Sequence, residues 1–188
     1  MNIFGNIFRD MFDDAFSEVL RICFLCALAF GFSYAFGEHI QTFKANFVQK
    51  TTSQDNILSY SGQVLAKIPA KAKWLYQAPT EKEIYINDTE TIVYEPFLEQ
   101  ASIGQAKRKI DFLQILRQAE LQPNGTYRAI FEGTEYILSL KNDKPYRLTF
   151  SDEFENSVEI IFQDVRINEP IDDAEFIFIA PPNIDIIR

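Results

Sequence analysis

The stretch from Tyr60 to Gln100 constrains the fold most, because its apolar residues recur at the two-residue period of a β-strand. Residues 60–68 and 72–78 each place apolar side chains in one register and mostly polar ones in the other. The segments 83–87 and 91–95 follow and are joined by the turn-forming residues 88–90, a pattern typical of a hairpin. The stretch therefore predicts an antiparallel meander with one apolar face.

The second half of the chain repeats this pattern. Residues 127–131, 136–140, 146–150 and 158–162 alternate in the same way, and Asn142-Asp143 is typical of a tight hairpin turn. Ile161 and Val165 interrupt the alternation of the last of these strands, which indicates a bulge. Residues 102–108 are polar and contain a glycine, and residues 176–179 predict a short final strand.

Two segments have helical spacing instead. Residues 38–50 place Ile40, Phe43 and Phe47 on one stripe, and residues 110–120 place Ile110, Leu113 and Leu116 on another. Phe112 and Ile115 flank the second stripe, so this helix should bury a broad surface. We expect a single, mainly β domain with two amphipathic helices against its sheet.

The N-terminal residues 1–35 predict a signal peptide. Residues 22–32 are apolar or small, follow Arg21 and precede Ser33 and Ala35, which fit a cleavage site. This apolar core is too short to span a bilayer. The acidic residues among positions 1–18 do not fit a signal peptide, so these positions are either a misassigned start or a real amphipathic extension. We expect a mature domain over residues 36–188.

The cysteines and the charge narrow the class of protein. Cys23 and Cys26 both lie in the predicted signal peptide, and neither follows the pattern that precedes a lipid-modified cysteine. We therefore expect an unlipidated, soluble, monomeric protein in the periplasm. The formal net charge of −9 argues against a nucleic-acid partner, which would need clustered lysine and arginine.

The sequence offers little for catalysis. His39 is the only histidine, and it has no cysteine partners in the mature domain with which to bind a metal ion. The nearest approach to a nucleophile elbow, residues 59–62, lacks the leading glycine. The acidic pairs 152–153 and 172–173 are typical of solvated turns. We expect neither an enzyme nor a bound cofactor.

The identities of several residues are more specific than their spacing. The pattern G-x-V-x-x-K-x-P is followed by K-W-x-Y-x-x-P, a hairpin and Y-E-P-F-L-E-Q. The matching residues are Gly62, Lys67, Pro69, Trp74, Pro79, Tyr94, Pro96, Phe97, Glu99 and Gln100. This ordered set, within a likeness from about Phe43 to the C-terminus, resembles the LolA family of periplasmic lipoprotein carriers.

The resemblance implies a half-open, unclosed antiparallel β-barrel with an α-helical lid. The concave apolar face would take up the acyl chains of lipoproteins, which an inner-membrane ABC transporter releases to the carrier and which the carrier brings to the outer membrane, to an acceptor where one exists. By spacing, we place on this face Val64, Ala66, Trp74, Tyr76, Ile84, Ile86, Tyr94, Phe131, Leu138 and Leu148, and on the lid Phe112, Leu113 and Leu116.

Two positions depart from the family pattern. Ile68, which we also include in the binding site, stands where many members have arginine, and Ala72 stands where many have an aromatic residue. A latch of hydrogen bonds from that arginine to carbonyl groups of the lid is therefore not expected in this chain. The fold is expected to be the same.

Three alternatives remain open at this stage. An outer-membrane acceptor of the LolB kind would share the fold but would need a lipidated N-terminal cysteine. A secreted hydrolase would need a base beside a nucleophile. A structural periplasmic domain that sequesters a protein partner would bind no lipid.

Overall fold

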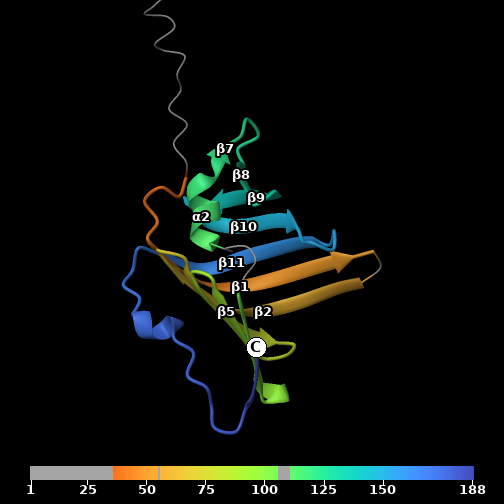
Figure 1. Ribbon diagram of the computed structural model, residues 1–188. Helices are drawn as coiled ribbons and strands as arrows, with labels where there is room; N and C mark the ends of the chain where they lie inside the picture. The colour runs from red at the N-terminus through yellow and green to blue at the C-terminus, as the bar shows by residue number, and fades with distance from the viewer. Residues whose placement is uncertain (1–35, 55, 106–110) are drawn as a thin grey trace, which may run out of the picture. The chain divides into compact units, whose positions relative to one another are not determined.

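The computed structural model describes residues 36–54, 56–105 and 111–188 of the chain (Figure 1). The predicted signal peptide, its two cysteines and Ile110 lie outside these residues. The described part forms one twelve-stranded sheet with the order β12-β6-β5-β4-β3-β2-β1-β11-β10-β9-β8-β7. The strands pair antiparallel, except that β12 runs parallel to β6. The sheet does not close on itself, as the family resemblance implies.

The first half of the sheet consists of β1 (Thr42–Ser53), β2 (Asn56–Lys67), β3 (Lys71–Ala78), β4 (Lys82–Asn87), β5 (Glu90–Glu95) and β6 (Gln100–Gln105). The second half consists of β7 (Glu120–Leu121), β8 (Tyr127–Phe131), β9 (Thr134–Lys141), β10 (Lys144–Ser151) and β11 (Ser157–Ile167), and β12 (Asp185–Ile187) pairs with β6. Short 3-10 helices η1 (Pro96–Leu98) and η2 (Asp173–Phe176) lie in the connections.

The predicted meander and its turns are confirmed. Strands β2 to β5 pair in sequence order, and the turn before β5 has Asp88 at a φ of 53°. Asn142 and Asp143 both have positive φ between β9 and β10, as expected of a tight hairpin turn. The bulge in β11 is also present, because its register against β1 shifts between Gln163 and Arg166 and Asp164 has a φ of 52°.

The helix predicted over residues 38–50 is wrong, because most of this segment is strand β1. Phe43, Ala45 and Phe47 alternate along β1 and are all buried on one face. Phe43 and Phe47 are four residues apart, a spacing that places two side chains on the same side of either a helix or a strand. Between β2 and β11, this segment gains backbone hydrogen bonds along both edges.

One prediction near the β12 edge of the sheet is also wrong. The polar stretch that starts at residue 102 begins in strand β6, whose Ile103 packs on the face opposite to α2. The predicted strand over residues 176–179 is instead the end of η2 and an irregular segment, and β12 forms further on. Phe176 and Phe178 alternate because both are packed, Phe176 fully buried and Phe178 against Tyr85, without a strand ladder.

The second predicted helix is confirmed as α2 (Phe112–Gln118). The Asp111 carboxylate caps it by accepting a hydrogen bond from the Gln114 backbone N–H at 3.1 Å, which satisfies one of the free donors of the first turn. In the described residues, α2 is the one α-helix, and it lies across one face of the sheet (Figure 1). None of the described helices is long and apolar enough to cross a membrane.

Candidate functional site

The sheet face beneath α2, which we call the inner face, holds the largest apolar cluster of the domain. At its centre the Phe112 ring lies against three rings of the sheet, with centroid distances of 5.0 Å to Phe43, 5.8 Å to Trp74 and 5.7 Å to Phe162. Two of these contacts are edge-on and one is tilted, arrangements that aromatic quadrupoles favour over a face-to-face stack. Through Phe112, α2 therefore holds β1, β3 and β11 together.

The apolar side chains of α2 are removed from water. Leu113 and Leu116 are 1% and 0% exposed, and Ile115 is buried beside them. Residues 36 and 37 close the C-terminal end of the helix, where the Phe36 N–H donates to the Ala119 carbonyl at 3.1 Å. A side chain at Gly37 would collide with the Leu116 carbonyl, so this approach requires glycine.

The structure brings nearly all of the predicted site residues together on the inner face. The inner-face cluster contains Val64, Ala66, Ile86, Phe112, Leu113, Leu116, Phe131, Leu138 and Leu148 as buried members and Ile68, Trp74, Tyr76 and Ile84 as partly buried ones. They come from β2, β3, β4, α2, β8, β9 and β10 and from the turn after β2, so the face extends over both halves of the sheet. Their part in ligand binding stays a prediction.

Tyr94 is the exception, and its predicted position on the inner face is wrong. Tyr94 is paired with Glu83, whereas Val93 is paired with the inner-face residue Ile84. Since residues directly opposite one another in a sheet share a face, Val93 points inward and Tyr94 outward. Tyr94 packs instead in a second cluster on the outer face, against Phe178 at a ring distance of 5.4 Å.

Sequence reasoning missed inner-face residues that lie on β1 and β11. Phe43, Phe47 and Phe162 are buried there, and the Phe47 ring lies 5.2 Å from Trp74 and 5.1 Å from Tyr76. The alternation of Phe43, Ala45 and Phe47 was the signal that could have identified β1.

Gly62 in the first motif has a geometric reason. A bulge in β3 shifts its register against β2 between Ser61 and Gly62. At this point β2 comes so close to β3 that a Cβ on Gly62 would collide with the Leu75 carbonyl. Glycine is needed here for close backbone packing beside the inner face.

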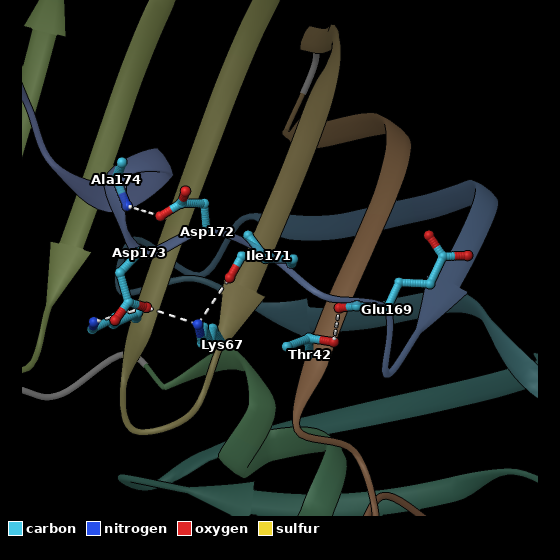
Figure 2. Close-up of polar contacts among 8 residues, drawn as sticks. Thr42, Lys67, Glu169, Ile171, Asp172, Asp173 and Ala174 are labelled. Carbon is cyan, nitrogen blue, oxygen red and sulfur yellow. Dashed lines mark hydrogen bonds and ion pairs between the residues drawn. The ribbon is translucent and has the colours of Figure 1, made fainter.

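Lys67 in the same motif fastens the chain after β11 to the edge of the inner face, as Figure 2 shows. We call residues 168–176 the C-terminal strap. The Lys67 ammonium donates to the Ile171 carbonyl at 2.8 Å and pairs with Asp173 at 2.8 Å, and Lys71 pairs with the same carboxylate at 3.2 Å. The hydrogen bond from Lys67, and then that from Lys71, lowers the pKa of Asp173 below its ordinary value.

Hydrogen bonds between side chains and backbone groups hold the start of the strap as well. The Thr42 hydroxyl donates to the Glu169 carbonyl at 2.7 Å, and the Asn168 side chain both accepts from the Gln41 N–H and donates to the His39 carbonyl. At the other end, the Asn87 amide donates to the Phe176 carbonyl at 2.8 Å. The strap thus ties the starts of β1 and β3 to the ends of β2 and β4.

The arrangement suits binding of hydrocarbon. The apolar cluster of the inner face consists of aliphatic and aromatic side chains, and the two-turn helix α2 covers part of it. Apolar surface of this kind favours alkyl chains by excluding water. Where α2 covers the inner face, a ligand can enter only if α2 or its neighbours give way, because the apolar side chains of α2 are buried against the sheet.

Comparison with known proteins identifies the family. Residues 38–116 match the family model for "Outer membrane lipoprotein carrier protein LolA". The outer-membrane lipoprotein carrier protein of Helicobacter hepaticus is 39% identical over 157 residues, covering 82% of this chain and 88% of that protein. The one from Wolinella succinogenes is 38% identical over 171 residues, covering 90% and 99%.

A solved structure supports the fold alone. An uncharacterized conserved protein from Thermus thermophilus aligns with a TM-score of 0.51 at 14% identity, covering 82% of this chain and 94% of that one. The sequence relatives decide the family, because their identity is high and extends over most of both chains. The chain belongs to the LolA family of outer-membrane lipoprotein carrier proteins.

Proposed function

We propose that this protein is a periplasmic carrier that holds the acyl chains of lipoproteins between α2 and the inner face. An inner-membrane ABC transporter supplies the lipoprotein, and the carrier brings it to the outer membrane or to an acceptor there. The observation on which this rests is the continuous apolar inner face closed by one short helix. The names of the relatives support a carrier rather than a membrane-anchored acceptor.

The energies of closing and of loading are comparable. Exposing the four buried side chains of α2 (Phe112, Leu113, Ile115 and Leu116) costs about 1.5–3 kcal/mol each, or roughly 6–12 kcal/mol together. Moving an acyl chain from water into an apolar site gains about 0.8 kcal/mol per methylene, on the order of 10 kcal/mol for a long chain. One acyl chain can therefore replace the packing that α2 loses.

The similar energies of closing and of loading are suited to a protein that takes up a lipoprotein and releases it again. Because the acyl chain leaves one apolar environment for another, its transfer from a bilayer to the carrier is nearly neutral in free energy. Net movement then depends on the proteins that load and unload the carrier, and the carrier itself needs no covalent chemistry.

The proposal is tested by asking what the protein binds in its own compartment. We would co-express it with an acylated lipoprotein, purify it without detergent and search for acylated protein by mass spectrometry. The variant Ile84→Asp places a charge at a partly buried inner-face position, and the control Ile130→Asp places one at a position that is 55% exposed. We expect lipoprotein with the wild type and the control but not with Ile84→Asp.

Two results would contradict the proposal. One is wild-type protein without any acylated partner. The other is Ile84→Asp with as much lipoprotein as the wild type, since a buried carboxylate beside an acyl chain is strongly unfavourable.

A further inference from the structure

The inner face changes character along its strands. Under α2 it is apolar, with Phe43 and Phe47 on β1, but the next inward positions of the same strand are Gln49 and Thr51. A cavity of about 400 Å³ lies at this end of the face and is lined by Gln49, Thr51, Tyr60, Tyr76, Lys82 and Glu95, among others. Its volume lies within the range of about 300–1,000 Å³ that is usual for small-ligand sites.

All six residues belong to the inner face. Tyr60 is paired with Gln49, Gly62 with Tyr76, and Tyr76 with Lys82, so these positions share one side of β1 to β4. Ile84 also lines the cavity and is partly buried against the apolar cluster. The polar cavity is therefore continuous with the face that we propose for acyl chains.

The cavity contains a chain of neutral hydrogen-bonding groups. The Tyr76 hydroxyl donates to Gln49 Oε1 at 3.1 Å, and Gln49 Nε2 donates to the Thr51 hydroxyl at 3.2 Å. Burial, and secondarily the neighbouring Tyr60, raises the pKa of Tyr76 to about 12, so its phenol stays protonated in any physiological medium.

Tyr60 supplies a further donor. Its ring meets the Tyr76 ring edge-on, with centroids 5.9 Å apart, and both residues line the cavity. Within the described residues, the Tyr60 hydroxyl has no hydrogen-bond partner. A ligand carbonyl entering the cavity could accept from it without breaking a hydrogen bond among the described residues.

The charges at the cavity cancel. The Lys82 ammonium lies 3.4 Å from a Glu95 carboxylate oxygen, and both side chains are partly exposed, at 40% and 31%. A phosphate that approached Lys82 would also meet Glu95, and it would have to displace that carboxylate. An uncharged ester or amide meets no such repulsion.

We propose that this cavity binds the uncharged ester and amide groups that join the acyl chains of a lipoprotein to its N-terminal cysteine, in preference to the phosphate of a phospholipid. The inference rests on the proposed function and adds a basis for selectivity. Acyl chains and their glyceryl esters alone cannot give it, because lipoproteins and phospholipids share both. The junction differs in charge, and the cavity lies where a chain seated along the inner face would end.

The test uses two ligands with the purified protein. One is a synthetic peptide whose N-terminal cysteine carries an S-linked diacylglyceryl group, and the other is the hydrocarbon dye diphenylhexatriene, which senses only apolar surface. Gln49→Met with Tyr60→Phe removes two polar groups from the cavity, and Gln63→Met is the matched control because Gln63 is paired with Asn46 and Leu75 on the outer face.

We expect the double variant to bind the lipopeptide about tenfold more weakly, as loss of two hydrogen bonds implies, and the dye with unchanged affinity. The control should bind both like the wild type. If the wild type binds the lipopeptide and the double variant binds it equally well, this inference is wrong while the proposed function stands. If the wild type binds the dye but no lipopeptide, the proposed function fails.

A second measurement tests the charge argument. In competition with the lipopeptide, a short-chain diacylglycerol should displace it better than phosphatidylglycerol with the same chains. In Glu95→Gln, where Lys82 has lost its counter-charge, phosphatidylglycerol should gain several-fold while diacylglycerol should not. Equal competition by the two lipids in the wild type, or no gain for phosphatidylglycerol in the variant, would overturn the proposed preference.

Discussion

The ring of Phe112 and the indole of Trp74 meet edge-on where α2 rests on the sheet, with centroids 5.8 Å apart. Trp74 is the only tryptophan of the chain. Its fluorescence therefore reports directly on the contact between the helix and the inner face.

We predict that acyl ligands change this fluorescence. An acyl chain that enters beneath α2 must separate the Phe112 and Trp74 rings and replace the aromatic contact with alkyl groups. Titration of purified protein with a fatty-acyl ligand should shift the emission of Trp74, and Phe112→Leu should reduce the shift. Calorimetric binding of the same ligand with unaltered emission would place the ligand elsewhere.

Truncation of the lid should cost stability. Leu116 is fully buried, so Leu116→Ala should lower the free energy of unfolding by about 2–5 kcal/mol through lost burial and a residual cavity. The control Ile130→Ala, at a position exposed on β8, should stay within about 0.5 kcal/mol. Urea unfolding measures both, and equal midpoints for the two variants would show that α2 is not part of the core.

Much of this fold could be predicted from the sequence where only one period fits the apolar residues. Strands β2 to β5 and β8 to β10 alternate over several residues, so the pattern identifies them and places Val64, Trp74 and Leu138 on one face. Phe43 and Phe47 satisfy a helix and a strand equally, and only the pairing of β1 with two neighbours decides between these structures.

The candidate site was harder to predict at its margin. Tyr94 is a large aromatic residue in an alternating strand, but alternation does not tell which of two faces is inward. On β5 the side that carries Ile92 and Tyr94 is covered by Phe178 and Ile184 of the C-terminal segment, so apolar side chains gather on the outer face as well. The position of this distant segment, and of the strap, cannot be derived from local periodicity.

A third prediction concerns Ile68, where many family members have arginine. Ile68 packs against the inner-face cluster, and α2 is held by apolar contacts of Phe112, Leu113 and Leu116. An acyl chain can replace such contacts but could not replace hydrogen bonds to helix carbonyls. Provided that its guanidinium reaches α2, Ile68→Arg should strengthen closure and reduce lipoprotein loading, because arginine offers five donors.

Loading by purified wild type and variant, with hydrogen exchange across residues 112–118, measures this effect. Ile68→Leu is the control for the loss of isoleucine packing. An arginine variant that loads as well as wild type, with the same exchange in α2, would show that position 68 has no part in closure here.

The strap gives a fourth prediction, on pH. Hydrogen bonds from Lys67 and then Lys71 favour the ionised Asp173, so the pKa of this carboxyl lies below its ordinary value of 3.8 in the folded protein. A lowered pKa contributes stability that is present above the unfolded value and is lost as the pH falls through the folded one. Below about pH 4 the strap should therefore loosen.

Hydrogen exchange of residues 168–176 between pH 6 and pH 3, corrected for intrinsic rates, measures this loosening. In Asp173→Asn the strap should be looser at pH 6 and should change less on acidification, whereas Asp185→Asn, which alters an exposed acid outside the strap, should behave like the wild type. Equal acid sensitivity in wild type and Asp173→Asn would contradict the role assigned to this ion pair.

The account depends most on the claim that acyl chains lie on the inner face. A lipoprotein whose acyl chains carry a photoreactive diazirine would be loaded onto the carrier, irradiated and mapped by mass spectrometry. Neighbouring residues of one strand give the sharpest contrast, because Val64 points inward while Leu65 is paired with Lys73 on the outer face. We predict crosslinks at inner-face residues such as Val64, Trp74 and Leu138, and crosslinks concentrated at Leu65, Tyr85 or Ile92 would contradict the account.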